Sequence, residues 1–405
     1  MAKRSGLTVI ATTRNQEKVI MLLEKGADHV LVDDVRLEPK LRPMEFTPAT
    51  VHVTIYDSAR IRISPLHFQQ FLIIPLHMKT RNGTSTTITA RTAGQQFAED
   101  VLAGLCRIPK NLHAKYFYDK EGDALFQQIM ACPEYYLTRC ELEIFQSQTG
   151  QLADIISASQ RAFNLIELGA GDATKSQYLL DELVQRPVPF TYMPIDISGN
   201  ILSVLGERLR SELPGLDILP LEGEYLDMLQ FATERSPRRN VVMFLGSNIG
   251  NMHAEEALGF CKELRSLLHP GDLALIGFDL KKHPKIILHA YDDPGGITAK
   301  FNLNLLKRIN RELEADFNLQ QFEHYQMYDP DNGACKSYLV SLQDQTVRIG
   351  PHRVAFARDE TIFMEISQKY TPKEIEQMAS EAGFAPMRQL SDSKGWFADV
   401  FWEAV

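Results

Sequence analysis

The sequence predicts an α/β fold built on a mainly parallel sheet. Between about residues 163 and 278, apolar strand-like runs alternate with segments that have the period of amphipathic helices. The first run leads into Leu165-Ile166-Glu167-Leu168-Gly169-Ala170-Gly171, a strand followed by a Gly-x-Gly turn and a helical pattern. Such a turn lets the backbone approach a nucleotide-like ligand closely. Because similar turns also join strands to helices in proteins that bind nothing there, the motif alone does not establish a ligand.

The elements of this alternating section follow in order. Strands are predicted at 163–168, 192–196, 218–221, 241–245 and 273–278, and helices at 174–185, 200–213 and 254–268. Helices before this section are predicted at 97–106, 123–130 and 138–156. After it we expect helices at 302–317 and 372–383 and strands at 338–342, 347–349, 361–366 and 396–403. The strands between 338 and 366 follow one another closely, which favours antiparallel pairing.

The N-terminal part differs from the rest. Residues 1–34 have a strand–helix–strand pattern, with the helix at Asn15–Lys25, and the string TVIATTRNQEKVIMLLEKGADHVLVDD resembles a fragment of the nucleotide-binding domain of medium-chain quinone reductases. This βαβ-like fragment lacks the Gly-rich turn that would hold a pyrophosphate, which counts against an NADPH-binding regulatory module. Residues 35–92 are interrupted by prolines and are expected to be a partly disordered linker, with short strands at 51–56 and 71–74. The segment is either an accessory module or, as we favour, an upstream stretch before a working protein that starts near Met78.

Composition limits the function classes. The length of 405 residues suggests two or three domains, and 44% hydrophobic with 23% charged residues is typical of a globular protein. A net charge of -9 argues against nucleic acid as the main partner. The 5 cysteines show no Cys-x-x-Cys spacing, so neither a metal site nor a disulfide framework is expected. No apolar run approaches the ~20 residues of a membrane span or forms a signal-peptide core, and we expect a cytoplasmic protein.

Open α/β sheets bind ligands at the carboxyl ends of their strands. Here those ends carry Gly169, then Asp196 about 25 residues further on, and then Glu224 and Tyr225. The acid after the second strand is placed to accept hydrogen bonds from ribose hydroxyls, and Glu224 with Tyr225 is placed for an adenine. These acids do not separate NAD from S-adenosylmethionine (SAM), but the short turn favours a ligand without a pyrophosphate. Lys175 is either a partner for that ligand's carboxylate or an exposed helix lysine.

Five strings stand out in the second part of the chain: KYFYDKEGDALFQQIMACPEYYLTR, LIELGAGDATK, MFLGSNIGNM, AYDDPGGITAKFNLNLLKRINRELEADF and FMEISQKY. Together they resemble one family, the histidine-specific Nα-methyltransferases of ergothioneine biosynthesis. The resemblance covers about residues 95–405. It implies SAM dependence and conversion of L-histidine to its Nα-trimethylated form, hercynine. It also implies a Rossmann-type class I methyltransferase domain, residues 138–279 and 372–405, with a second α+β substrate-binding domain, residues 93–137 and 280–371.

The resemblance also assigns cofactor contacts residue by residue. It implies that Gly169, Lys175 and Asp196 contact SAM and that Glu224 and Tyr225 lie at the adenine. The family more often has Asp-Phe at the last two positions. The Glu224 carboxylate is one methylene longer than aspartate, and this leaves its reach to the adenine amino group open.

For the substrate, the resemblance places Tyr118 nearest the reacting amine and Tyr135 beside it. Asn251 and Tyr291 would bind the α-carboxylate, and Glu365 and Ser367 the imidazole. The last assignment agrees with the chemistry, because two residues apart on a strand share one face and neutral imidazole needs one acceptor and one donor.

More ordinary roles compete with these assignments. Tyrosines commonly line cores with the hydroxyl at the edge. Glu365 could be a buried ion-pair partner, and Asn251 could cap the helix expected near Ala254. The substrate could also be another amine, such as an indole amino acid, although such a relative would not need the Glu365 and Ser367 pair. We expect a monomer.

Overall fold

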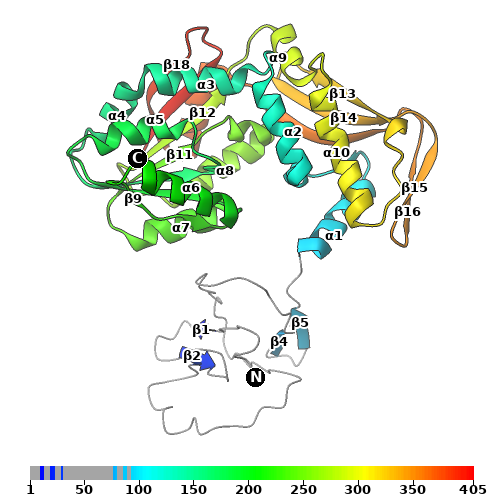
Figure 1. Cartoon of the computed structure of the whole chain (residues 1–405), viewed down its shortest axis with the longest axis horizontal. Coiled ribbons are helices and arrows are strands. Elements are labelled where there is room, and N and C mark those ends of the chain that lie inside the picture. Colours follow the sequence, from blue (N-terminus) through cyan, green and yellow to red (C-terminus); the bar gives the residue numbers. More distant parts are fainter. Residues whose placement is uncertain (1–9, 13–18, 23–28, 31–75, 80–84, 89–92) are drawn as a thin grey trace. The chain divides into compact units, whose positions relative to one another are not determined.

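The computed structural model describes residues 10–12, 19–22, 29–30, 76–79, 85–88 and 93–405 (Figure 1). The chain divides into two compact units, Met1–Gln96 and Phe97–Val405. No helix among the described residues combines the length and apolar character needed to cross a membrane.

The described part of the first unit consists of short antiparallel strands. β1 (Ile10–Thr12), β2 (Val19–Leu22) and β3 (His29–Val30) form one sheet, and β4 (Leu76–Lys79) pairs with β5 (Ser85–Ile88). The helix expected at Asn15–Lys25, and with it the βαβ-like unit, is wrong, because Val19–Leu22 is a strand antiparallel to β1. Four consecutive apolar residues do not separate a strand from a buried helix by periodicity. The strands expected at 51–56 and 71–74, and most of the expected linker, lie outside the described residues.

An eight-stranded sheet organises the second unit, in the order β10-β8-β7-β11-β12-β19-β18, with β9 also paired to β8. The bounds are β7 (Phe163–Leu168), β8 (Phe190–Asp196), β9 (Asp217–Ile218), β10 (Leu221–Glu222), β11 (Arg239–Phe244), β12 (Leu273–Asp279), β18 (Phe384–Ser391) and β19 (Phe397–Ala404). The first five strands in this order, β10, β8, β7, β11 and β12, run parallel to one another. Strand β19 is antiparallel to both of its neighbours, β12 and β18. The strand order reverses between β7 and β11, which creates a topological switch point at their carboxyl ends. The predicted α/β fold is confirmed.

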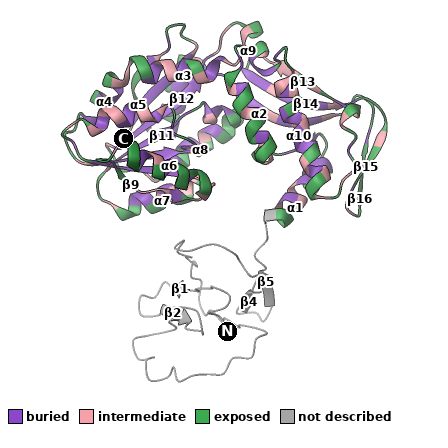
Figure 2. Ribbon diagram, in the orientation of Figure 1, coloured by how far each residue is buried: buried purple, intermediate pink, exposed green. Residues whose placement is uncertain are grey.

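Helices cover both faces of this sheet. The core on one face includes residues of α3 (Tyr136–Ser147), α4 (Thr149–Ser157), α5 (Ser176–Val184) and α6 (Gly199–Glu212). The core on the other includes residues of α7 (Tyr225–Arg235), α8 (Ala254–Ser266) and α11 (Pro372–Ala382). Leu165 belongs to the first core and its neighbour Ile166 to the second. Strands covered on both faces are buried along their length and are therefore mainly apolar, as in β7. Figure 2 shows the same burial along the neighbouring strands β11 and β12.

Several elements differ from the sequence prediction, among them the helix expected at 302–317, which spans Ile297–Glu312. The helix expected at 138–156 is two helices, because Gln148 leaves helical geometry with φ −125° and ψ 18°. The strand expected at 218–221 is split into β9 and β10 around Pro220, a residue with no N–H to donate. The helices α7 and α9 (Pro284–Tyr291) were not predicted.

A four-stranded sheet, β13-β14-β17-β6, forms the other half of this unit. Its strands are β6 (Lys110–Asn111), β13 (Phe322–Tyr328), β14 (Ala334–Ser341) and β17 (Thr361–Gln368), and β15 (Gln345–Ile349) forms a hairpin with β16 (His352–Phe356). The expected antiparallel pairing is confirmed for β14 with β17. The helical elements here are α1 (Ala93–Leu105), α2 (Lys120–Ala131), α10 (Ile297–Glu312) and the short 3-10 turns η3 (Ala114–Tyr116) and η5 (Leu319–Gln321).

Segments that lie far apart in the sequence build this second core. Phe97 and Val101 of α1 share a buried cluster with Phe301 and Leu305 of α10, and α2 lies beside α10 (Figure 1). The shared core supports our proposal that residues 93–137 and 280–371 form one substrate-binding domain.

Candidate functional site

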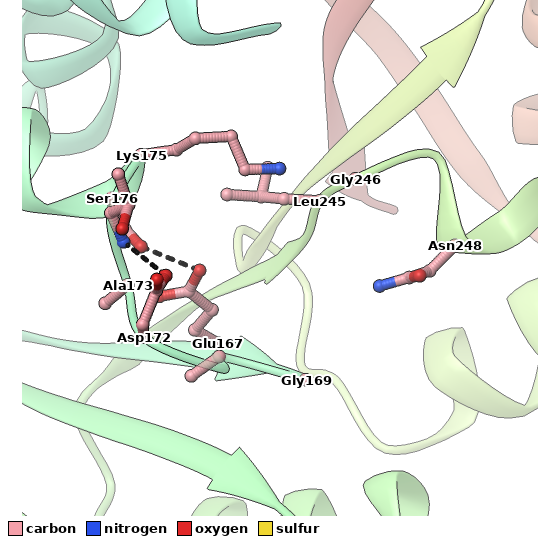
Figure 3. Close-up of a pocket in the computed structure, with 11 residues that line it drawn as sticks. Glu167, Gly169, Asp172, Ala173, Lys175, Ser176, Leu245, Gly246 and Asn248 are labelled. Atoms are coloured by element: carbon pink, nitrogen blue, oxygen red, sulfur yellow. Dashed lines mark hydrogen bonds between the residues drawn. The ribbon is translucent and has the colours of Figure 1, made fainter. Parts of the chain in front are cut away.

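Two cavities adjoin at the switch point of the large sheet. A small one of about 80 Å³ surrounds the turn after β7, from Gly169 to Ser176 (Figure 3). A larger one of about 580 Å³ lies next to it, and Gly246 and Asn248 line both. These two residues belong to the turn after β11, which leads into η4 (Asn248–Asn251). The site therefore occupies the place where open α/β sheets bind their ligands.

Gly169 needs to be glycine for two reasons. Its φ is +71°, in the left-handed region that side chains disfavour. A Cβ built there would lie 2.8 Å from the Tyr225 hydroxyl oxygen. The backbone of the turn thus approaches the first residue of α7 with no side chain between them.

Asp196 and Glu224 lie near this turn but outside the described lining of both cavities. Asp196 Oδ2 accepts a hydrogen bond from the Gly171 N–H at 3.3 Å, and Oδ1 accepts one from the Ser198 N–H at 2.9 Å. A carboxylate has about four acceptor positions, so capacity remains for ribose hydroxyls. Glu224 is exposed and occupies the N-cap position of α7.

Lys175 is not an ordinary exposed helix lysine. It lines the small cavity, and its Nζ forms an ion pair with Glu141 of α3, whose side chain is only 1% exposed. Glu141 Oε1 also accepts a hydrogen bond from the Gly246 N–H at 2.7 Å. One buried carboxylate therefore connects the turn after β7 with the turn after β11, and Figure 3 shows the Lys175 side chain extending toward Leu245 and Gly246.

The larger cavity brings together all six residues expected at the substrate. Its lining includes Tyr118, Tyr135, Asn251, Tyr291, Glu365 and Ser367, and also Tyr225 from the cofactor set. They come from separate segments: the loops before α2 and α3, η4, the last turn of α9, and β17. The small cavity adds Gly169 and Lys175.

Nine of the eleven predicted site residues thus line the two cavities, the exceptions being Asp196 and Glu224. Which residue touches which ligand group stays a prediction.

Aromatic rings form one wall of the larger cavity. The Tyr135 and Tyr291 rings meet edge to face with centroids 6.0 Å apart, and the Tyr118 ring lies 5.6 Å from that of Phe126. Tyr118 keeps 48% of its surface exposed, so it is not a core tyrosine. Desolvation, helped by the charge of Glu365, raises the pKa of the Tyr118 phenol well above its usual range. Tyr118 is therefore protonated near neutral pH and can orient an amine, but it does not act as a phenolate base.

Glu365 is held by neutral groups. Its Oε1 accepts long hydrogen bonds from Ser337 Oγ at 3.3 Å and Asn302 Nδ2 at 3.4 Å. A β-bulge in the pairing of β14 with β17 lies directly beside it, between Ser337 and Tyr338. Bulges re-aim side chains and are frequent next to active sites. Burial raises the pKa of Glu365, while these donors and the charge of Lys369 act to lower it.

Ser367 and Tyr291 are in direct contact. Their hydroxyl oxygens lie 2.7 Å apart, and both accept a hydrogen bond from the Lys369 ammonium. The two groups expected at the imidazole and at the α-carboxylate are thus coupled by one buried cation.

Asn251 does not cap the following helix, because α8 begins after His253, which occupies the N-cap position. It is the last residue of η4, which packs against β17. That packing requires Gly250, where a Cβ would lie 2.9 Å from the Gln368 carbonyl oxygen. The close approach brings Asn251 into the cavity that Glu365 and Ser367 also line.

Comparison with known proteins agrees with this geometry. The family model described as "Histidine-specific methyltransferase, SAM-dependent" matches residues 97–404. The chain belongs to this methyltransferase family. The histidine N-alpha-methyltransferase of Mycolicibacterium smegmatis is 36% identical over 312 residues, which cover 76% of this chain and 95% of the relative. That of Mycobacterium tuberculosis is 37% identical over 302 residues, 74% of this chain and 92% of the relative. Ergothioneine biosynthesis protein 1 of Schizosaccharomyces pombe is 29% identical over 286 residues, 69% of this chain and 36% of that protein.

Sequence reasoning missed several residues that shape this methyltransferase site. Ser337 and Asn302 hold Glu365, Glu141 holds Lys175, and Lys369 holds Ser367. Only Lys369 had a local signal, since it continues the alternation of Glu365 and Ser367 along one strand face. Among the described residues, no group of three or more His, Cys, Asp or Glu side chains could hold a metal ion.

Glu167 is a buried acid in β7, close to the turn that follows this strand. Its Oε1 accepts from Ser176 Oγ at 2.8 Å, as Figure 3 shows, and its Oε2 from the Tyr192 hydroxyl at 2.5 Å. Burial raises the pKa of Glu167 to about 7, against 4.5 for a free glutamate, although both hydrogen bonds oppose the shift. Between pH 4.5 and about pH 7, Glu167 therefore keeps a proton in the folded chain that it has already released in the unfolded chain.

Glu167→Gln is expected to remove a pH-dependent loss of stability. Because the folded pKa is raised, the contribution of Glu167 is fully present below the unfolded value of 4.5 and is lost as pH rises through about 7. Between pH 5 and pH 8, the free energy of unfolding of the wild type should fall relative to Glu167→Gln by about 2–3 kcal/mol. Urea unfolding at both pH values measures this difference. Parallel pH dependence in the two proteins would contradict the raised pKa.

Proposed function

We propose that this methyltransferase transfers methyl groups from SAM to the α-amine of L-histidine and forms the Nα-trimethylated product, hercynine, in ergothioneine biosynthesis. The observation that carries the proposal is the placement of Glu365 and Ser367 in a cavity that adjoins the turn after β7. The names of its relatives, histidine N-alpha-methyltransferase and ergothioneine biosynthesis protein 1, support the same substrate and pathway.

The residues around the small cavity fit SAM. In our proposal, the backbone at Gly169 contacts the cofactor, Asp196 accepts from the ribose, and Tyr225 with Glu224 lies at the adenine. Lys175, kept charged beside Glu141, faces the cofactor carboxylate. SAM supplies a methyl group activated by a sulfonium. The chain's own task is to position the acceptor, since an aligned nucleophile gains much of its rate from placement alone.

The histidine would be held at both ends. Glu365 accepts the ring N–H and Ser367 serves the other ring nitrogen, while Asn251 and Tyr291 bind the α-carboxylate. Tyr135 forms the wall behind the ligand, and Tyr118 orients the amine. The amine must lose a proton before each transfer. Because the Tyr118 phenol is itself protonated, that proton leaves through water rather than to a phenolate.

Another amine, such as an indole amino acid, is the second candidate. Indole has a single ring N–H and no nitrogen acceptor, so it would use Glu365 and leave Ser367 without a partner. The presence of both polar groups in one cavity favours imidazole.

Product analysis tests the substrate. With SAM present, L-histidine is expected to gain one, two and finally three methyl groups, whereas L-tryptophan at the same concentration gains none. Mass spectrometry of the reaction mixture measures this outcome. Methylated tryptophan without methylated histidine would overturn the histidine assignment and leave only the enzyme class.

We also propose a monomer that works in the cytoplasm. The free cysteines, four buried and one exposed at Cys106, fit a reducing compartment.

A further inference from the structure

A buried lysine lies behind the proposed histidine site. The Lys369 side chain is 0% exposed, and its Nζ lies 2.6 Å from Asp279 Oδ2, 2.6 Å from the Tyr291 hydroxyl and 2.8 Å from Ser367 Oγ. An ammonium group has three N–H donors and no acceptor. Each of its donors therefore has one oxygen partner, and two of those oxygens belong to residues that line the larger cavity.

Asp279 does not by itself explain why this lysine is there. The Asp279 carboxylate also forms an ion pair with Lys282 and accepts from the Tyr136 hydroxyl at 2.9 Å. Two lysines, Lys282 and Lys369, therefore share one carboxylate. A buried excess charge is costly unless other groups stabilise it. Lys282 already neutralises Asp279, so the contacts that set Lys369 apart are those to Tyr291 and Ser367.

These contacts restrict the two hydroxyl groups. An oxygen that accepts from an ammonium turns its own hydrogen elsewhere, and Tyr291 and Ser367 both accept from Lys369. In their 2.7 Å contact one hydrogen lies between the two oxygens, and the other is left to point away from the lysine. When a ligand separates them, both hydrogens become available to it.

We propose that Lys369 is a positioning residue that fixes Tyr291 and Ser367 as hydrogen-bond donors toward the substrate. The inference rests on the proposed histidine function. If Ser367 can only donate, the imidazole nitrogen that faces it must be unprotonated. Glu365, on the same strand, accepts and therefore requires an N–H on the other ring nitrogen. The site then selects neutral imidazole in one tautomer. An imidazolium or an indole would leave the Ser367 hydroxyl facing no acceptor, and an unpaired buried donor is costly.

The test compares Lys369→Met with Lys282→Met as a matched control. Both substitutions remove one lysine from Asp279, but only the first removes the donor to Tyr291 and Ser367. Isothermal titration with L-histidine is done in the presence of S-adenosylhomocysteine, whose own affinity is measured first. We expect Lys369→Met to weaken histidine binding by about 10- to 100-fold and Lys282→Met by less than about 3-fold. Both should bind S-adenosylhomocysteine as the wild type does.

A double-mutant cycle separates positioning from a general structural role. If Lys369 acts through Ser367, Lys369→Met should weaken histidine binding at least about 3-fold less in a Ser367→Ala background than in the wild type. A purely structural effect would add in full to that of Ser367→Ala.

The outcomes are distinct. Three results would each overturn the inference and leave the proposed function standing. They are equal losses of histidine affinity in the two lysine variants, full additivity in the double-mutant cycle, and wild-type histidine affinity in Lys369→Met. A wild type that binds S-adenosylhomocysteine but not histidine would overturn the proposed function and the inference with it. Should Lys369→Met also lose S-adenosylhomocysteine, Lys369→Leu, which likewise has no donor, is judged by the same criteria.

Discussion

Glu365→Ala is expected to lower the affinity for L-histidine by about 100-fold, because a charge-assisted hydrogen bond is lost and a ring N–H is left unpaired in the cavity. Affinity for S-adenosylhomocysteine should not change, since Glu365 does not line the small cavity. Isothermal titration with L-histidine and S-adenosylhomocysteine measures both values. Ser337 and Asn302 donate to Glu365 and hold it in place, and neither carries the negative charge that the substitution removes.

Two control variants define the origin of this loss. Glu365→Gln keeps a carbonyl acceptor without the charge and should lose only about 10-fold. Glu323→Ala removes an exposed carboxylate from β13 of the same sheet and should bind histidine normally. If Glu365→Ala binds histidine like the wild type, the assignment of Glu365 to the imidazole is wrong.

Gly169→Ala should weaken binding of S-adenosylhomocysteine by about 100-fold. The new Cβ would lie 2.8 Å from the Tyr225 hydroxyl and displace that side chain from the proposed adenine site. The residue must also keep φ at +71°, which costs a side chain about 1–2 kcal/mol. Titration of the purified variant with S-adenosylhomocysteine measures the loss, and circular dichroism verifies that the fold is intact.

Gly171→Ala is the matched control. Its φ of +53° imposes a similar backbone cost, but no heavy atom lies within 4 Å of the added Cβ. We expect a loss of less than about tenfold, set by the backbone term alone. Equal losses in both variants would show that the contact with Tyr225 does not matter.

Local sequence patterns predicted the large sheet well, because a strand covered on both faces has a continuous apolar sequence. The run at 163–168 matches β7 residue for residue, and α11 begins at Pro372 as predicted. The latter helix has a Thr371 and Glu374 capping box, a short-range signal that does not depend on the rest of the fold.

Predictions failed where local patterns were ambiguous or interrupted. Val19–Leu22 is a short apolar run that fits either a strand or a helix, and its pairing with β1 makes it a strand. The break between α3 and α4 lies at Gln148, two residues before Gly150, and the Gln148 side chain donates to the Ser391 carbonyl oxygen of β18. That contact comes from a segment more than two hundred residues away and cannot be predicted from neighbouring residues.

The sequence by itself determined the α/β class, the family and the residue types of the site, because each depends on patterns within short segments. The tertiary structure decided which of these residues meet. It pairs Lys175 with Glu141 across the two turns, and it joins Lys369, Tyr291 and Ser367 beside Asp279. Lys369 and Tyr291 are 78 positions apart, and their contact exists only because β17 and α9 fold against the end of β12. The strand alternation placed Glu365 and Ser367 on one face, but only that packing showed the cation that contacts Ser367.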